Sequence, residues 1–79
     1  MKLKDKVAIV TGGGRDIGKS VSLQLAAEGA RVAVNYRSDA EAAQATVAEI
    51  EAAGGTAILV QADVTRPEDP IMQGIPASF

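Results

Sequence analysis

The sequence predicts an α/β fold in which three parallel strands alternate with two helices, a βαβαβ half of a doubly wound sheet. Three observations predict it. Short apolar runs alternate with two segments of helical periodicity. These runs are apolar throughout, as in strands that helices cover on both faces. A glycine-rich turn joins the first run to the first helical segment. Right-handed crossovers then give the strand order 3-2-1, with both helices on one face.

The first predicted strand, over residues 7–10, is a short apolar run closed by the glycine turn. The helix after it, over 16–28, has apolar side chains every four residues, which we expect to face the core. They are Ile17, Val21 and Leu25. Gly29 ends this helix because glycine readily adopts the left-handed conformation of a helix C-terminus.

The second strand is predicted over residues 31–36, which are rich in valine. Ser38 or Asp39 then caps a second helix over 39–53, because their side-chain oxygens accept bonds from free amides. The third strand covers 57–60, with Asp63 close behind it. Residues 1–64 therefore form the α/β unit.

The last fifteen residues, 65–79, are predicted to be an aborted third helix and an irregular tail. Residues 65–68 form a capping box, but Pro70 removes a backbone donor within the expected helix. The second face of the sheet and the outer edge of the first strand are then left bare, which predicts poor stability and self-association. In the alternative, the tail folds back over that face through Ile71, Met72, Ile75 and Phe79.

Composition excludes several classes of function. The chain has 79 residues, a net charge of −2, no cysteine and no histidine. Disulfides, zinc sites with these ligands and a Ser–His–Asp triad are therefore absent. A weakly acidic chain without a basic cluster is a poor nucleic-acid binder. Its apolar runs are far shorter than the ~20 residues of a membrane helix or the ~7–15 of a signal peptide, which favours a cytoplasmic protein.

The glycine turn at residues 11–20 matches two phosphate-binding patterns. Gly13, Gly18, Lys19 and Ser20 satisfy the P-loop pattern, in which the lysine reaches the phosphates and the serine holds Mg²⁺. In that reading Asp63 could serve as a metal-binding acid. Alternatively, the turn holds the pyrophosphate of a dinucleotide at the start of a helix.

The second interpretation is carried by a resemblance. The segment TGGGRDIG at 11–18 resembles the T-G-x-x-x-G-x-G turn of the short-chain dehydrogenase/reductase family. The segment 25–38 is similar to the family's first-helix end and second strand, and 62–64 to its acid after the third strand. The similarity covers residues 4–69. It implies the front of a Rossmann-like, NAD(P)-binding domain from an oxidoreductase acting on carbonyls or alcohols, of the 3-oxoacyl reductase type or similar.

One departure from the family pattern is Asp16, which stands at the family's middle glycine. A carboxylate there repels a pyrophosphate, but it also caps free amides at a helix N-terminus. Three interpretations stay open: a structural cap, an acceptor for the ribose, or a lesion that weakens cofactor binding.

The resemblance also bears on which cofactor is bound. Members that bind NAD place an acid at the end of the second strand, where this chain has Asn35. Arg37, Ser38 and Arg15 suit a 2′-phosphate instead, so we expect NADP(H), with NAD as the weaker alternative. The expected cofactor-binding residues are Gly12, Gly14, Arg15, Asp16, Ile17, Gly18, Asn35, Tyr36, Arg37, Ser38, Asp63 and Val64.

The catalytic residues implied by the resemblance are missing. The family uses a serine, a Tyr-x-x-x-Lys pair and an asparagine, whereas Tyr36 is the only tyrosine and Ala40 stands four residues after it. We therefore expect no catalytic residue and no metal site here, and an inactive chain that binds its dinucleotide weakly. The alternatives are a stand-alone nucleotide-binding or interaction module completed by a partner, and a P-loop nucleotide hydrolase.

Overall fold

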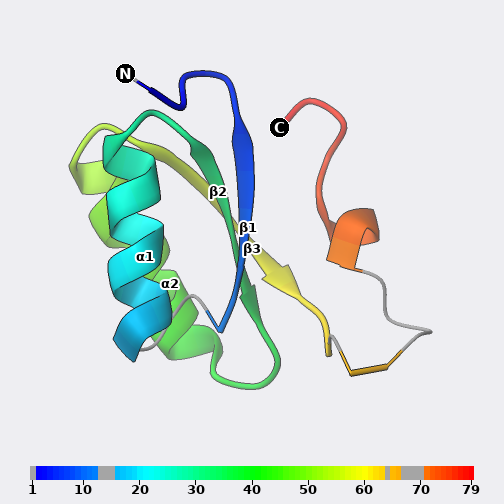
Figure 1. The fold of residues 1–79 in the computed structure, drawn as a ribbon. Helices are drawn as coiled ribbons and strands as arrows, with labels where there is room; N and C mark the ends of the chain where they lie inside the picture. Colours follow the sequence, from blue (N-terminus) through cyan, green and yellow to red (C-terminus); the bar gives the residue numbers. More distant parts are fainter. Residues whose placement is uncertain (1, 13–15, 64, 67–70) are drawn as a thin grey trace.

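The fold is known from a computed structural model, which describes residues 2–12, 16–63, 65–66 and 71–79. The described strands run parallel in the order β1-β2-β3, which confirms the predicted topology (Figure 1). The elements are β1 (Val7–Thr11), α1 (Asp16–Ala27), β2 (Arg31–Tyr36), α2 (Ala40–Ala52), β3 (Thr56–Gln61) and the short 3₁₀ helix η1 (Ile71–Gly74).

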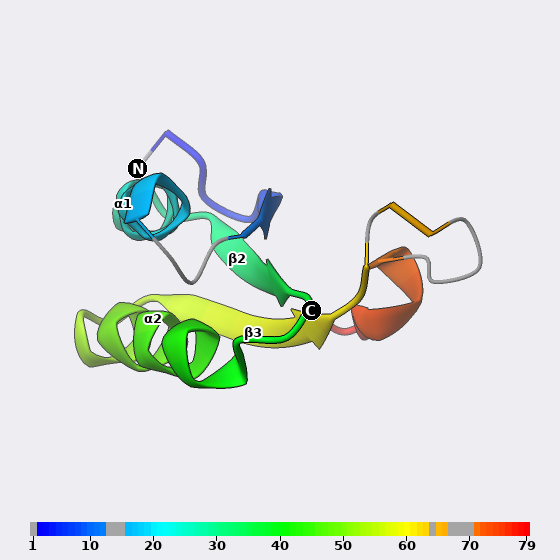
Figure 2. The same ribbon diagram turned by 90° about the horizontal axis from the view of Figure 1, so that it is seen from below.

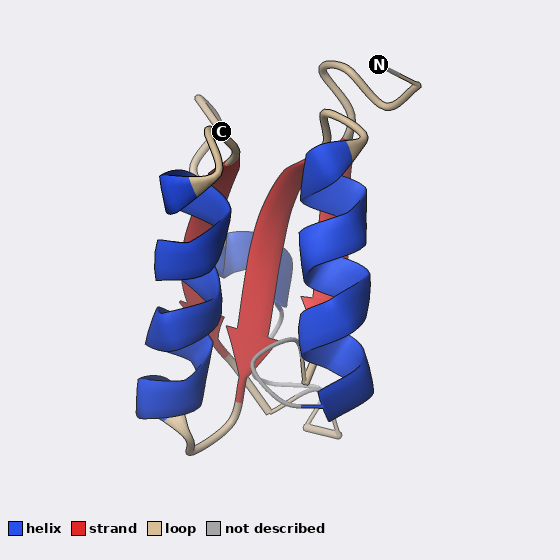
Figure 3. Cartoon of the chain, turned by 90° about the vertical axis from the view of Figure 1, so that its left-hand side faces the viewer, coloured by secondary structure: helices blue, strands red, loops and turns tan. Residues whose placement is uncertain are grey.

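Both long helices cover the same face of the sheet, as the right-handed crossovers predict (Figures 2 and 3). The helix α1 packs over β1 and β2, and α2 packs over β2 and β3. The central strand is consequently the most buried, with Val32, Ala33 and Val34 fully enclosed. Ala43 and Ile50 of α2 pack on it from above, so the core lies between this strand and the two helices.

The buried face of α1 differs from the expected apolar stripe. Ile17 is 80% exposed and Val21 is 40% exposed. Ser22 is instead the fully buried residue, and its hydroxyl donates to the carbonyl of Gly18 at 2.8 Å. Leu25 does pack against the core. The stripe is therefore wrong at its first two positions, because α1 lies at the β1 end of the sheet and none of the described elements lies beyond β1.

Of the two predicted N-cap residues of α2, Ser38 and Asp39, the structure shows Asp39 in that role. The carboxylate of Asp39 accepts a hydrogen bond from the amide of Ala42 at 3.1 Å, so Asp39 is the N-cap residue. Near the C-terminal end of the same helix, Glu49 forms an ion pair with Lys19 of α1 at 2.8 Å. The two helices are thus linked to each other as well as to the sheet.

The second face of the sheet is partly covered by the tail, as the fold-back alternative describes. In Figure 2 the segment 71–79 lies on the side of the sheet opposite the helices. A Cβ atom on Gly74 would stand 2.6 Å from Cγ1 of Val60, so the tail backbone touches β3. The guanidinium of Arg31 donates to the carbonyl of Phe79. The expectation of a bare face is therefore wrong over β3, where Val60 is 2% exposed.

The bare face persists over β1. There, Val7 is 48% exposed and Ile9 is 37% exposed. The side chains of Ile75 and Phe79 are half-buried. The aborted third helix predicted from residue 65 onward falls mainly on residues 67–70, Pro70 included, which lie outside the described residues. The tail therefore shields the β3 side of the second face and leaves the β1 side open.

Candidate functional site

A cleft opens at the carboxyl ends of the three strands, where ligands bind in open parallel sheets. It encloses about 370 Å³, within the ~300–1,000 Å³ of small-molecule sites. Four of the predicted cofactor-binding residues line it together: Gly12, Asn35, Arg37 and Asp63. Three residues that were not predicted to bind the cofactor also line it: Thr11, Ala62 and Thr65.

Gly12 follows β1 at the rim of this cleft, with φ at +65°. This left-handed conformation favours glycine, because a Cβ would crowd the backbone. Among the described residues, no heavy atom lies within 4 Å of the place where that Cβ would stand. None of them therefore covers the backbone of Gly12 on that side. The predicted residues Gly14, Arg15 and Val64 lie outside the described residues.

Asp16 is the first residue of α1 and also has a left-handed backbone, with φ at +43°. Aspartate tolerates this region better than most residues, but glycine adopts it without strain. The position where the family pattern has glycine is thus one where the backbone itself favours glycine. Ile17 projects into solvent beside it, and Gly18 is half-buried with its carbonyl bonded to Ser22.

Asn35, near the end of β2, is 3% exposed. Its side-chain nitrogen donates to the carbonyls of Val60 and Ala62, both at 3.1 Å. The amide therefore joins the ends of β2 and β3, and its two N–H groups are used inside the protein. At this position the chain has a structural donor where NAD-binding relatives are expected to have an acid.

The backbone after β2 is fixed by two hydrogen bonds. The carbonyl of Tyr36 accepts from the amide of Ala62 at 3.1 Å, and that of Arg37 accepts from the side chain of Gln61 at 3.3 Å. Tyr36 is half-buried and packs against the core, and it is not among the residues that line the cleft. Arg37 and Ser38 are exposed, and Arg37 is the positively charged residue among the described residues that line the cleft.

Asp63 is held in a turn by Thr65. Its Oδ1 accepts from the hydroxyl of Thr65 at 2.6 Å and from the Thr65 amide at 3.0 Å. These hydrogen bonds lower the pKa of the carboxyl, and the nearby charges of Arg37 and Arg66 lower it further. An Asp side chain often accepts a hydrogen bond from the backbone amide two residues on, which was the signal available for Thr65 in the sequence. Asp63 therefore stands charged at the cleft.

Lys19, the lysine of the P-loop pattern, pairs through its ammonium group with Glu49 of α2. The described residues also contain no group of three or more side chains suited to hold a metal ion. The structure thus gives no support to the nucleotide hydrolase alternative.

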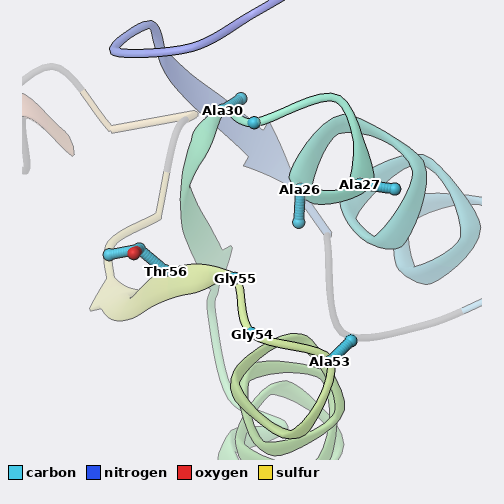
Figure 4. Close-up of a pocket in the computed structure, with 8 residues that line it drawn as sticks. Ala26, Ala27, Ala30, Ala53, Gly54, Gly55 and Thr56 are labelled. Atoms are coloured by element: carbon cyan, nitrogen blue, oxygen red, sulfur yellow. The ribbon is translucent and has the colours of Figure 1, made fainter. Parts of the chain in front are cut away.

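A second hollow, of about 190 Å³, lies at the opposite end of the sheet, between the C-terminal ends of α1 and α2 (Figure 4). Alanine, glycine and one threonine line it: Ala26, Ala27, Gly29, Ala30, Ala53, Gly54, Gly55 and Thr56. These side chains offer no acid, base or nucleophile at neutral pH. In the part of the chain that is described, no helix has the length and apolar character of a membrane span.

Known proteins match this chain over most of its length. The pattern of the short chain dehydrogenase family fits residues 6–75. The short-chain dehydrogenase/reductase homolog YusS of Bacillus subtilis is 49% identical over 69 residues, which are 87% of this chain and 63% of YusS.

Solved structures agree with the sequence matches. The reductase LugOII superposes with a TM-score of 0.88 and 44% identity, over 92% of this chain and 31% of its own. A short chain dehydrogenase from Burkholderia cenocepacia in complex with NADP superposes with a TM-score of 0.80 and 51% identity. The match covers 86% of this chain and 28% of that protein. The chain thus spans less than two thirds of YusS and about 30% of these two structures. With 70 of its 79 residues matched by the family pattern, this chain belongs to the short-chain dehydrogenase family.

Proposed function

We propose that this chain is the part of a short-chain oxidoreductase that binds the adenosine end of NADP(H), and that it does not catalyse hydride transfer alone. The observation that carries the proposal is the cleft at the carboxyl ends of the strands. It combines a glycine backbone that no described residue covers at the Cβ position with an exposed arginine at one edge of the sheet.

The preference for a 2′-phosphate rests on charge and reach. Arg37 lines the cleft directly after β2, and its planar guanidinium matches the oxygens of a phosphate. The residue at the expected acid position, Asn35, is neutral and is turned to Val60 and Ala62. No carboxylate at the end of β2 therefore opposes a phosphate. The relative from Burkholderia cenocepacia, solved with NADP, supports the same cofactor.

Asp63 supports binding at the other side of the cleft. Its lowered pKa keeps the carboxylate charged, and the turn with Thr65 fixes its orientation. A fixed carboxylate accepts hydrogen bonds from an adenine amino group or a ribose hydroxyl without reorganising.

The nicotinamide of NADP(H) supplies a hydride, but the reaction also needs a proton donor beside the substrate. The sequence has one tyrosine, Tyr36, whose ring packs against the core. Neither histidine nor cysteine is present to replace it. Sustained turnover of carbonyl or alcohol substrates by this chain alone, if it survived repurification and were abolished by Gly18→Asp, would contradict this part of the proposal.

The preference is tested by NMR titration with 2′-AMP and 5′-AMP. We expect 2′-AMP to bind more tightly, with shifts at Gly12, Arg37 and Asp63. Arg37→Ala should weaken 2′-AMP binding by about 1.5–3 kcal/mol, roughly 10- to 100-fold, and leave 5′-AMP nearly unchanged. Lys4→Ala is the matched control, because it removes one exposed positive charge ahead of the amino end of β1. Equal affinities for the two nucleotides would refute the preference.

A further inference from the structure

The side chain of Asn35 connects two strands at the rim of the cleft. It is 3% exposed and lies on β2, one residue before that strand ends. Its Nδ2 donates to the carbonyls of Val60 and Ala62, each at 3.1 Å. Only the nitrogen of an amide side chain can donate, so two carbonyl neighbours fix which way the group is turned. Asn35 therefore acts on the end of β3 through its nitrogen.

Ala62 is the first residue after β3, yet both of its backbone groups are bonded to β2. The pairing of the two strands ends with Tyr36 opposite Gln61, the last residue of β3. Beyond this pair, the amide of Ala62 donates to the carbonyl of Tyr36 at 3.1 Å, and its carbonyl accepts from Asn35. The side chain of Asn35 thus helps to extend the attachment of β3 to β2 by one residue.

The bond to the carbonyl of Ala62 also bears on Asp63, because the two residues share one peptide unit. That carbonyl and the amide of Asp63 lie in the same plane, so Asn35 fixes the plane from which Asp63 leaves the sheet. The carboxylate of Asp63 accepts from Thr65, and its backbone carbonyl accepts from the amide of Arg66. These bonds shape the turn internally, whereas Asn35 bonds at the point where the turn joins the sheet.

We propose that Asn35 is a positioning residue for nucleotide binding: its amide holds the peptide between Ala62 and Asp63, so that the carboxylate of Asp63 stands at the cleft. The side chains of Asn35 and Asp63 both belong to residues that line this cleft. The proposal rests on the proposed function, in which Asp63 accepts hydrogen bonds from the adenosine end. It adds that the affinity depends on a side chain that acts through Asp63.

The expected effect of Asn35 is local. Its two bonds reach the last residues of the β3 segment, so loss of the amide should loosen that end before the middle of the strand. An acceptor that is already held in place binds more tightly than one that must be ordered on binding, because ordering costs free energy. Loss of the amide should therefore weaken binding even in molecules that remain folded.

A double-mutant cycle separates positioning from direct contact with the nucleotide. NMR titration with 2′-AMP measures the affinity of the parent, Asn35→Ala, Asp63→Ala and the double variant, under conditions where circular dichroism shows each to be folded. We expect each single change to weaken binding by about tenfold or more. Once the carboxylate of Asp63 is absent, Asn35→Ala should add less than about twofold. An effect of Asn35→Ala that persists in full without that carboxylate would overturn the proposal.

Thr46→Ala is the matched control for general stability. Thr46 is also fully buried, and its hydroxyl donates to the carbonyl of Ala42 at 3.2 Å, but both residues lie on α2. The control therefore removes a buried donor to a backbone carbonyl without touching the cleft, and it should leave the affinity for 2′-AMP unchanged. An equal loss of affinity in Thr46→Ala and Asn35→Ala would show that stability alone is responsible.

Hydrogen exchange tests the same contact without a nucleotide. Asn35 is the only asparagine of the chain, and in the parent its side-chain protons should exchange about tenfold or more slowly than those of the exposed Gln44. In Asn35→Ala, the amide of Ala62 should lose more protection than amides in the middle of β3. Fast exchange of the Asn35 protons in the parent, or a uniform loss along β3, would refute the positioning role alone. A parent chain that binds no 2′-AMP would instead refute the proposed function.

Discussion

Replacing Asn35 with aspartate would be the obvious way to turn an NADP-binding relative toward NAD, because it restores the acid expected at the end of β2. In this structure the change should unfold the chain instead. The Asn35 nitrogen donates to the carbonyls of Val60 and Ala62, both at 3.1 Å, and the side chain is 3% exposed. A carboxylate would face two carbonyl oxygens with no proton to donate.

The magnitude follows from these contacts. Loss of two hydrogen bonds and of the donors for two carbonyls costs about 2–3 kcal/mol, which is the value expected for Asn35→Ala. A buried, unpaired charge raises the cost of Asn35→Asp to about 3–5 kcal/mol. Small domains are stable by only ~5 kcal/mol or slightly more. Most of the stability should therefore be lost at neutral pH.

The pH dependence separates the charge from the lost hydrogen bonds. Burial beside two carbonyls raises the pKa of the introduced carboxyl in the folded state. The variant is then least destabilised below the ordinary pKa of about 3.9, and loses stability as the pH rises toward the raised value. Urea unfolding of Asn35→Asp and Asn35→Ala in parallel should show their difference growing from acid to neutral pH. Equal midpoints for Asn35→Asp and the parent at pH 7 would refute the reasoning.

Three further predictions follow from single contacts. Thr65→Val removes the hydroxyl that bonds to Asp63 but keeps the backbone amide, so the pKa of Asp63 should rise toward its ordinary value. A carboxyl NMR titration measures it, and an unchanged pKa would show that the hydroxyl is not the main cause of the lowered value. Lys19→Ala breaks an ion pair between partly exposed side chains, so it should cost at most about 1 kcal/mol in urea unfolding and leave nucleotide binding intact, whereas abolished binding would revive the P-loop interpretation. Gly74→Ala pushes the tail from Val60, so proteolysis should cut residues 71–79 faster than in the exposed control Gln73→Ala, and equal rates would contradict the contact.

Local patterns in the sequence were sufficient for the sheet and its two helices. The apolar runs at 7–10, 31–36 and 57–60 correspond to β1, β2 and β3 within one residue at either end, because short apolar runs bounded by turn residues are typical of strands in parallel sheets. Asp39 caps α2 through a hydrogen bond from the amide of Ala42, three residues later. Because the two residues are so close in the chain, the local sequence was enough to predict the cap. Because strands and helices alternate and crossovers are right-handed, the sheet was predicted with neighbouring strands in chain order, as observed.

The exposure and the hydrogen-bond partners of individual side chains could be seen only in the tertiary structure. Ile17 and Val21 have the spacing of a core stripe, yet their exposure depends on what lies beyond β1, which periodicity within α1 does not encode. Asn35 stands at the position that the family resemblance associates with the ribose, but its amide is turned to carbonyls 25 and 27 residues later in the chain. Lys19 fits a phosphate-binding pattern and pairs with Glu49, thirty residues away.

By itself, the sequence determined the α/β class, the strand order and the place of Gly12 at the edge where the cleft forms. These features depend on local periodicity, capping and the handedness of crossovers, all of which neighbouring residues set. The tertiary structure alone decided which polar groups are already used and which apolar groups remain exposed. Hydrogen bonds and burial connect residues far apart in the chain, so the partners of Asn35 and Lys19 and the exposure of Ile17 and Val21 emerged only when the strands and helices were assembled.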